Sequence, residues 1–98
     1  RSRVGHMVKI EVEVDTLEQL GLALQERVDA VLLDNMPPET LAEAVRRVNG
    51  IAITEASGGI SPATAAAVAA TGVDLLSIGW ITHSAPSLDI SLDFAIGI

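Results

Sequence analysis

Residues able to bind or polarise a substrate follow four apolar segments of the chain, each time where the segment ends. They are Glu13 with Asp15, Asp34 with Asn35, Glu55 with Ser57-Gly58-Gly59, and Gly79 with Thr82-His83-Ser84. Carboxylates can hold a divalent cation, and glycine-rich turns let backbone N–H groups approach a phosphate. The four sets together predict a site for a phosphorylated, metal-associated ligand.

Glu13 and Asp34 are predicted to lie at the ends of neighbouring strands. Two carboxylates that close repel each other unless something positive lies between them. Magnesium suits that position, because proteins hold it with one or two carboxylates together with waters and ligand phosphates. The alternative is that each carboxylate caps the following helix or pairs with a basic residue, and the residues alone favour neither interpretation.

The segment Ser57-Gly58-Gly59 precedes the start of a predicted helix. Glycines without side chains allow close backbone approach, and the helix dipole favours an anion there, although Gly-Gly also makes tight turns that bind nothing. Gly79 on the next loop favours the phosphate, since two glycine-bearing loops side by side are the phosphate pattern of (β/α) barrels. His83 follows on that loop, where it could bond a phosphate, act as acid or base, or simply lie in a polar loop.

Strands and helices alternate between these residues. Residues 9–15 alternate charged and apolar side chains with period two, which predicts a strand, and Thr16 with Gln19 has the spacing of a helix capping box. Further strands are predicted at 30–33, 51–55 and 73–78, with helices opening at Pro37-Pro38 and Ser61-Pro62. Each of the first two predicted helices has an apolar stripe, a row of apolar side chains along one face. The stripe is Leu17, Leu20 and Leu24 in the helix after Thr16, and Leu41, Ala44, Val45 and Val48 in the helix that opens at Pro37-Pro38. From Ser87 onward we expect a loop and a short helix.

Strand starts near residues 9, 29, 51 and 73 recur about every twenty-one residues. Strands joined by crossover helices are parallel, so the units fit a flavodoxin-like sheet or half of a (β/α)8 barrel. The first strand favours the barrel, because its charged face would be costly under helices but not in a lumen. We therefore predict an α/β fold of four consecutive βα units, a half-barrel of parallel strands.

Composition limits the function classes. With thirteen acidic and six basic residues, the net charge of −7 argues against a nucleic-acid partner. Cysteine is absent, which excludes disulfides and thiolate metal sites. No apolar run reaches the roughly 18 residues of a membrane span and no signal peptide opens the chain, so we expect no membrane partner and a cytoplasmic protein. None of the cations lies at the carboxyl end of a predicted strand, which leaves half of a phosphate site.

The chain resembles the quinolinate phosphoribosyltransferase family over nearly its whole length. Four segments carry the resemblance in order and spacing: Glu11-Val-Glu-Val-Asp15, Leu32-Leu-Asp-Asn35, Glu55-Ala-Ser-Gly-Gly59 and Gly79-Trp-Ile-Thr-His-Ser84. The resemblance implies transfer of the phosphoribosyl group of phosphoribosyl pyrophosphate to quinolinate. Carbon dioxide is then lost, and the product is nicotinate mononucleotide in NAD biosynthesis. It also implies Mg²⁺ as cofactor and a homodimer.

The family's site residues carry over by motif. The resemblance implies that Glu13 and Asp34 are the catalytic carboxylates, which hold the ribose hydroxyls and Mg²⁺, partly through water or ligand. It implies that the 5′-phosphate is bound by Ser57, Gly58 and Gly59 and, from the next loop, by Gly79 and His83. Trp80 stands where a small residue is common, which leaves the shape of the pocket wall open.

The resemblance also implies that the chain is only part of the family's enzyme. The family's residues that grip quinolinate and pyrophosphate belong to an N-terminal domain and earlier barrel strands. Residues 1–98 are therefore expected to be the C-terminal part of the barrel domain, inactive alone.

Two other interpretations stay open. A related barrel phosphoribosyltransferase, such as the nicotinate enzyme or the paralogue found beside molybdate transport genes, would share these motifs and differ in the residues that grip quinolinate. Alternatively, the chain is a non-catalytic half-barrel that only associates with itself or with its other half. An activity assay with and without that other half separates the classes.

Overall fold

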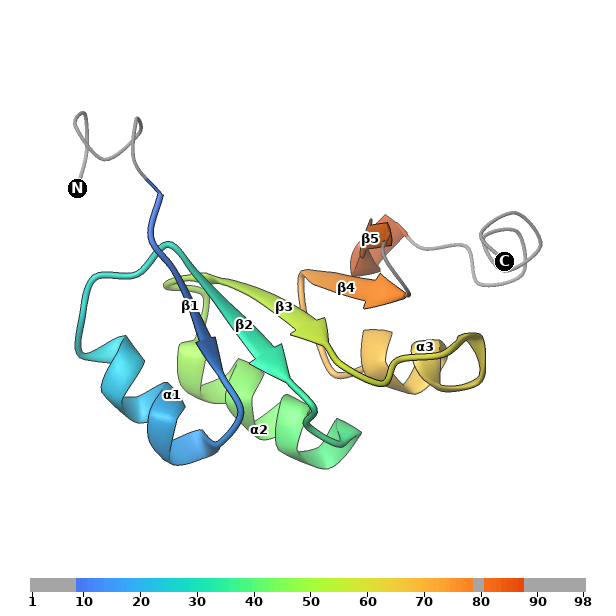
Figure 1. Cartoon of the computed structure of the whole chain (residues 1–98), viewed down its shortest axis with the longest axis horizontal. Helices are drawn as coiled ribbons and strands as arrows, with labels where there is room; N and C mark the ends of the chain where they lie inside the picture. Colours follow the sequence, from blue (N-terminus) through green and yellow to red (C-terminus); the bar gives the residue numbers. More distant parts are fainter. Residues whose placement is uncertain (1–8, 79–80, 88–98) are drawn as a thin grey trace.

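The protein forms a single five-stranded sheet with helices on one side (Figure 1). The computed structural model describes residues 9–78 and 81–87. Strands and helices alternate in the order β1 (Glu11–Val14), α1 (Leu17–Leu24), β2 (Ala30–Asp34), α2 (Pro38–Val48), β3 (Ile53–Ser57), α3 (Pro62–Ala69) and β4 (Leu75–Ile78). Strand β5 (Ile81–Ser84) and the 3₁₀ helix η1 (Ala85–Ser87) follow. The α/β class and the alternation of strands and helices are as predicted. The fourth βα unit is not, because β4 is followed by β5 and not by a helix. The half-barrel stays a prediction.

The sheet is parallel from β1 to β4, and its strands are ordered as they occur in the sequence. Only β5 is antiparallel, with Leu75 opposite Ser84 and Ile78 opposite Ile81. The prediction of parallel strands throughout was therefore wrong at Ile81–Ser84, which we had expected to be a loop. A strand that turns straight back on β4 can only pair antiparallel, because a parallel partner needs a long crossover.

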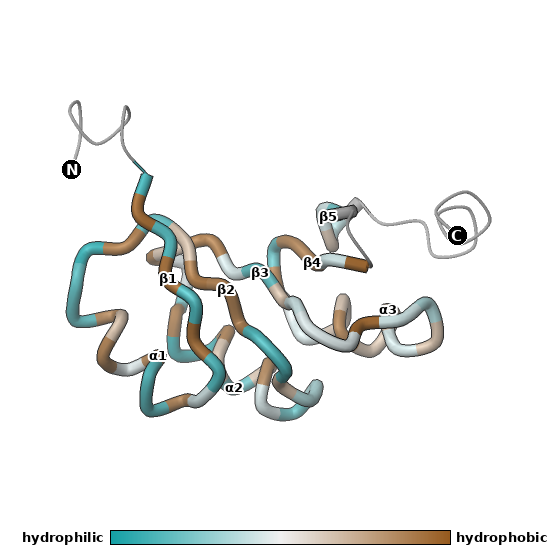
Figure 2. The backbone as a smooth tube through the Cα atoms, in the orientation of Figure 1, coloured by the Kyte–Doolittle hydropathy of each residue, from teal (hydrophilic) through white to brown (hydrophobic). Residues whose placement is uncertain are grey.

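The two faces of the sheet differ in character. In β2 and β3 every second side chain is buried, namely Val31 and Leu33, then Thr54 and Ala56. These side chains point toward the helices, all three of which lie on one side of the sheet in Figure 1. In β1 the alternation appears as bands of polar and apolar residues along the tube in Figure 2. No described helix covers the opposite face, which we call the open face.

The core lies between the sheet and the helices. Its largest fully buried side chains are Leu20, Leu33, Leu41, Leu76, Val31, Val48 and Val73. The predicted stripe of α2 is confirmed, since Leu41, Ala44 and Val48 are at most 2% exposed and Val45 packs against them. In α1 Leu20 is fully buried, and Leu17 and Leu24 are half-buried around it. The core is aliphatic, which suits small helices packed on a parallel sheet.

Helix boundaries follow local chemistry. The Thr16 hydroxyl accepts the backbone N–H of Gln19 at 3.0 Å, as the capping-box spacing predicted. The Gln19 side chain reaches one residue further back than in a regular box and accepts the N–H of Asp15 at 2.8 Å. At the end of α2, Asn49 adopts the left-handed conformation with φ 51° and donates its N–H to the Val45 carbonyl.

The same pair, Val-Asp, precedes both β2 and β4. The valines, Val28 and Val73, are buried. The carboxylate of Asp29 accepts the backbone N–H of Ile10 at 2.7 Å, and that of Asp74 accepts the N–H of Thr54 at 2.9 Å. Each aspartate thus fixes the start of the neighbouring strand, at the edge of the sheet opposite the predicted site.

Within residues 9–78 and 81–87, none of the helices has both the length and the apolar character to cross a membrane.

Candidate active site

The carboxyl ends of β1 to β4 lie at one edge of the sheet, because these strands are parallel. In open and closed α/β sheets this is the edge where ligands bind. The structure brings four of the predicted residues to it, namely Glu13, Asp34, Ser57 and Gly58, with Gly59 one residue further along the turn.

Glu13 and Asp34 share the open face. Glu13 on β1 pairs with Leu32 on β2, and Asp34 follows Leu32 by two residues on β2. Strand spacings then place their Cα atoms roughly 8 Å apart, within reach of a common ligand. Glu13 is exposed and Asp34 half-buried, so both side chains are accessible. Their predicted roles in binding ribose and Mg²⁺ stay predictions.

The turns after β2 and β3 interlock. The backbone N–H of Asn35 donates to the Ser57 carbonyl at 2.9 Å, with Asn35 in the left-handed conformation at φ 58°. Gly58 and Gly59 are also left-handed, at φ 85° and 71°. Glycine adopts this conformation without strain. The glycine turn is therefore positioned by the Asp34-Asn35 corner beside it.

Gly58 has a structural reason to lack a side chain. A Cβ there would lie 2.9 Å from the Asn35 backbone nitrogen and would also collide with the Asp34 carboxylate. At Gly59 the nearest atom would be Asn35 Oδ1 at 3.8 Å, an ordinary contact. Gly59 is exposed, and α3 begins soon after, at Pro62.

A hydroxyl–carboxylate network beside this turn was not predicted. Ser77 Oγ donates to Glu55 Oε2 at 2.9 Å and lies 3.1 Å from Thr82 Oγ1, which is itself 3.5 Å from Glu55 Oε2. Glu55 was expected at a strand end beside Ser57-Gly58-Gly59, but its hydrogen-bond partners were not. The available signal was Ser77, a hydroxyl in the otherwise apolar end of β4.

His83 lies on a different face from the carboxylates. It pairs with Leu76, which is fully buried on the helix side, and directly opposed residues in an antiparallel pair point the same way. The structure therefore does not bring His83 to the open face with Glu13 and Asp34. Gly79, the other residue predicted from this segment, lies outside the described residues, as does Trp80.

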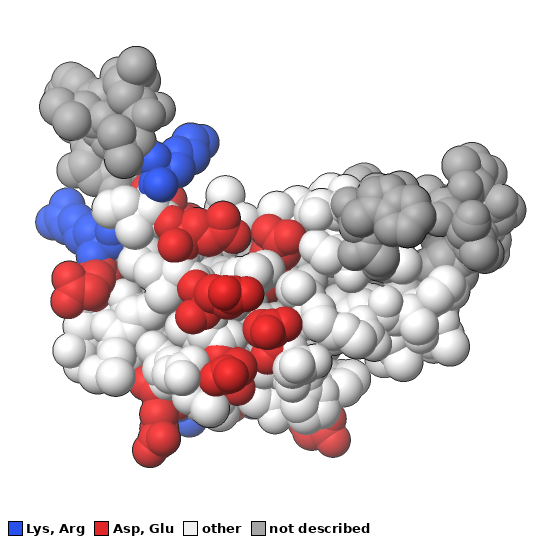
Figure 3. Space-filling model, in the orientation of Figure 1, with Lys and Arg blue, Asp and Glu red and all other residues white. Residues whose placement is uncertain are grey.

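Acidic side chains lie at the candidate site, and basic side chains lie away from it. Acidic side chains gather over β1 to β3 in Figure 3, whereas Lys and Arg lie mostly at one margin. Arg47 and Arg46 both pair with Glu43 on α2, and these hydrogen bonds hold the pKa of Glu43 below its ordinary value. Among the described residues no ion pair joins a cation to Glu13, Asp34 or Glu55. Of the described cations, Lys9 precedes β1, Arg27 follows α1, and Arg46 and Arg47 are in the last turn of α2.

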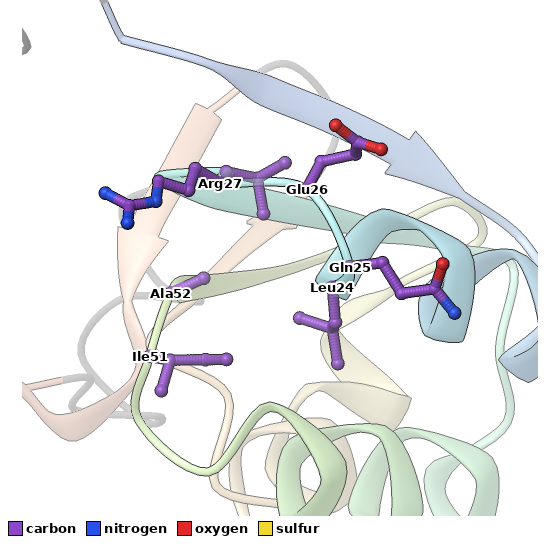
Figure 4. A pocket seen from close by; sticks show the side chains of 7 residues that line it. Leu24, Gln25, Glu26, Arg27, Ile51 and Ala52 are labelled. Atoms are coloured by element: carbon purple, nitrogen blue, oxygen red, sulfur yellow. The ribbon is translucent and has the colours of Figure 1, made fainter. Parts of the chain in front are cut away.

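A cleft of about 300 Å³ opens at the opposite edge of the sheet (Figure 4). It lies between the turn after α1 and the start of β3, and is lined by Leu24, Gln25, Glu26, Arg27, Val28, Ile51 and Ala52. None of the predicted site residues lines it. Among these lining residues Arg27 is the only cation, and Ile51 is 63% exposed.

Comparison with known proteins agrees with the motifs. A probable nicotinate-nucleotide pyrophosphorylase (carboxylating) of Bacillus subtilis is 44% identical over 96 residues, covering 98% of this chain and 33% of the relative. A nicotinate-nucleotide pyrophosphorylase (carboxylating) of Mycobacterium leprae is 50% identical over 86 residues, covering 85% and 30%. The chain thus spans about a third of the length of the curated relatives it matches.

Solved structures show the same fold. The nicotinate-nucleotide pyrophosphorylase of Ehrlichia chaffeensis matches with a TM-score of 0.69 at 38% identity, over 79% of this chain and 29% of that one. The family model for the quinolinate phosphoribosyl transferase C-terminal domain matches residues 1–93. This chain belongs to the quinolinate phosphoribosyl transferase family.

Proposed function

We propose that this chain supplies the ribose- and phosphate-binding side of a nicotinate-nucleotide pyrophosphorylase active site. The enzyme transfers the phosphoribosyl group of phosphoribosyl pyrophosphate to quinolinate and releases pyrophosphate and carbon dioxide, giving nicotinate mononucleotide. One observation carries the proposal. In a chain of this family, Glu13, Asp34 and the turn Ser57-Gly58-Gly59 meet at the carboxyl edge of a parallel sheet.

The substrate's 5′-phosphate would lie against the turn at Ser57-Gly58-Gly59. The exposure of Gly59 and the nearby start of α3 support this position, since backbone N–H groups and a helix N-terminus attract anions. A ribose ring attached to that phosphate would extend over the open face, toward Glu13 and Asp34. His83 would join the phosphate site only if β5 moves, because it now lies on the helix side. Gly79 stays a proposed phosphate ligand and lies outside the described residues.

The carboxylates suit the chemistry. When the bond between ribose C1 and the pyrophosphate oxygen breaks, pyrophosphate takes the electron pair and C1 gains positive character, while the quinolinate nitrogen forms the new bond. Fixed negative groups near C1 stabilise that charge more in the transition state than before it. We assign this role to Glu13 and Asp34. The cations that neutralise pyrophosphate and the quinolinate carboxylates must come from outside this edge.

Glu13 and Asp34 could supply part of the ligand set of a Mg²⁺ ion. Glu13 and Asp34 offer carboxylate oxygens on one face, but the described residues contain no group of three or more acidic or histidine side chains able to hold a metal. The remaining ligands would be waters and substrate oxygens, which is the coordination that Mg²⁺ prefers. When bound, the ion would neutralise charge on the leaving pyrophosphate.

The open face and the free edge of β1 support the barrel and its association. Carboxylates on a helix-free face are suited to a barrel lumen. In the described sheet β1 pairs only with β2, so its outer N–H and C=O groups have no strand partner. A preceding barrel strand or a second copy of the chain would pair there. We propose that residues 1–98 are part of such a barrel domain and act in a homo-oligomer.

Turnover by a chimera tests the function. In it, residues 1–93 replace the matching third of the Bacillus subtilis relative, and quinolinate-dependent pyrophosphate release is measured. Glu13→Ala and Asp34→Ala should each lower kcat about 10²-fold, and the double variant should be little worse because both groups act on one ligand. Glu11→Ala, which removes an acid from the far end of β1, is the control.

Near-normal turnover in either single variant would refute the assignment of that carboxylate. The 98-residue chain by itself should show no turnover, since the described strand ends carry no cation for pyrophosphate.

A further inference from the structure

Glu55 is held in a defined orientation on the open face. Its Oε2 accepts the Ser77 hydroxyl at 2.9 Å, and the Thr82 hydroxyl lies 3.5 Å from the same oxygen. Ser77 Oγ and Thr82 Oγ1 are 3.1 Å apart, so the two hydroxyls also support each other. No described residue donates a hydrogen bond to Oε1. The network therefore fixes one oxygen and leaves the other free to accept.

The position of Glu55 relates it to both predicted ribose carboxylates. Glu13, Leu32 and Glu55 form one row across β1, β2 and β3. Asp34, two residues beyond Leu32, lies diagonally between Glu13 and Glu55. Directly paired residues share a face, and so do residues two apart on a strand. The three carboxylates thus surround one area of the open face, with Asp34 nearest the strand ends.

Glu55 also lies on the same strand as the phosphate turn. Ser57 follows it by two residues, about 7 Å along the strand and on the same face. A phosphoribosyl group whose phosphate lay at Ser57-Gly58-Gly59 would therefore carry its ribose past Glu55. Glu55 is half-buried, and among the described residues no cation pairs with it.

We propose that Glu55 is a third carboxylate that binds the ribose, through Oε1, and that Ser77 is the positioning residue that orients it. The inference rests on the proposed function. A purely structural role for Glu55 would account for the hydrogen bonds to Oε2 but would give Oε1 no function. Ser77 is the one polar residue of the otherwise apolar strand β4, and among the described residues its hydroxyl bonds only Glu55 and Thr82. A serine there is explained if a defined carboxylate orientation is needed.

Two ligands that differ only in the ribose test the proposal. The 98-residue chain is titrated with ribose 5-phosphate and with inorganic phosphate, and dissociation constants are obtained from amide chemical shifts. Glu55→Gln should weaken ribose 5-phosphate about ten-fold, the effect of losing a charged acceptor. It should leave phosphate binding unchanged or slightly tighter, because a negative charge near the anion has gone.

Further variants separate positioning from folding. Ser77→Ala should weaken ribose 5-phosphate about three-fold, whereas Ser77→Thr, which keeps the hydroxyl, should restore wild-type binding. Glu11→Gln removes one charge from the same face, away from the ribose, and should weaken neither ligand. Thermal melting of each variant reports any loss of fold.

The outcomes distinguish the two proposals. Equal affinity of wild type and Glu55→Gln for ribose 5-phosphate would overturn the role of Glu55 alone. Equal weakening of both ligands by Glu55→Gln would also overturn it, because it would show a structural effect on the turn. If the wild-type chain bound neither ligand at residues 57–59, the proposed function would fail, and this inference with it.

Discussion

Asn35 and Gly58 touch across the ends of two neighbouring strands. A Cβ on Gly58 would lie 2.9 Å from the Asn35 backbone nitrogen, which itself donates to the Ser57 carbonyl. The glycine turn thus has a structural role that does not depend on a ligand. A side chain at Gly58 would disturb the turn whether or not phosphate binds there.

Gly58→Ala should therefore destabilise the chain more than Gly50→Ala. Both glycines are left-handed, at φ 85° and 80°, but a Cβ on Gly50 would meet nothing within 4 Å. Gly50→Ala should cost about 1–2 kcal/mol from backbone strain alone. Gly58→Ala should cost at least about 1 kcal/mol more, because backbone must also shift. Urea unfolding measures both, and equal losses would show that the close approach to Asn35 has been misjudged.

Thr54 and Asp74 should be coupled in stability. The Asp74 carboxylate accepts both the N–H and the hydroxyl of Thr54, at 2.9 and 3.2 Å, and Thr54 is only 3% exposed. Asp74→Ala should cost about 1–3 kcal/mol, because the Thr54 groups lose their acceptor. In a double-mutant cycle with Thr54→Val, the two losses should add to more than the loss in the double variant. Strict additivity would speak against the network.

Acid stability should depend on Glu43. Arg47 and Arg46 hold the pKa of Glu43 below its ordinary value of 4.5. The folded chain therefore keeps this carboxylate ionised more strongly than the unfolded chain does. The resulting stability is fully present above about pH 4.5 and is lost as the pH falls through the lowered pKa. Glu43→Gln should reduce the fall in Tm below pH 4.5, measured against Glu26→Gln, and identical profiles would contradict this.

The chain should self-associate in solution. The outer edge of β1 has no strand partner in the described sheet, and Ile53 is 49% exposed on the open face. The net charge of −7 opposes association, but at physiological salt the screening length is about 8 Å. Sedimentation at micromolar concentration should show a dimer or larger species.

Two substitutions of exposed apolar residues, one at Ile53 and one at Leu22, test this prediction. Ile53→Lys should weaken association, whereas Leu22→Lys, at an apolar residue on α1 that is more exposed than Ile53, should not. A compact, cooperatively melting wild-type monomer would refute the prediction.

Features encoded within a few residues were predictable from the sequence. The helix start at Thr16 and Gln19 depends on groups three residues apart, and the stripe of Leu41, Ala44 and Val48 follows from helix periodicity. The meeting of Glu13 with Asp34 required only that crossover strands be parallel.

Features that depend on distant partners were not predictable. Ile81–Ser84 has no apolar alternation strong enough to indicate a strand, and it becomes one by pairing with β4. The face on which His83 lies follows from that register, which is why it was missed. The bonds from Ser77 and Thr82 to Glu55 join residues 22 and 27 positions apart, so no local pattern indicates them.

The most direct test of the site is where ribose 5-phosphate binds. Titrating the ¹⁵N-labelled 98-residue chain and following each backbone amide locates the ligand without an activity assay. The account predicts saturable shifts at Ser57, Gly58, Gly59 and Asn35, with Gly50, at the opposite edge of the sheet, unchanged. Shifts concentrated instead at the cleft between Leu24 and Ile51, or no saturable shift at residues 57–59, would contradict it.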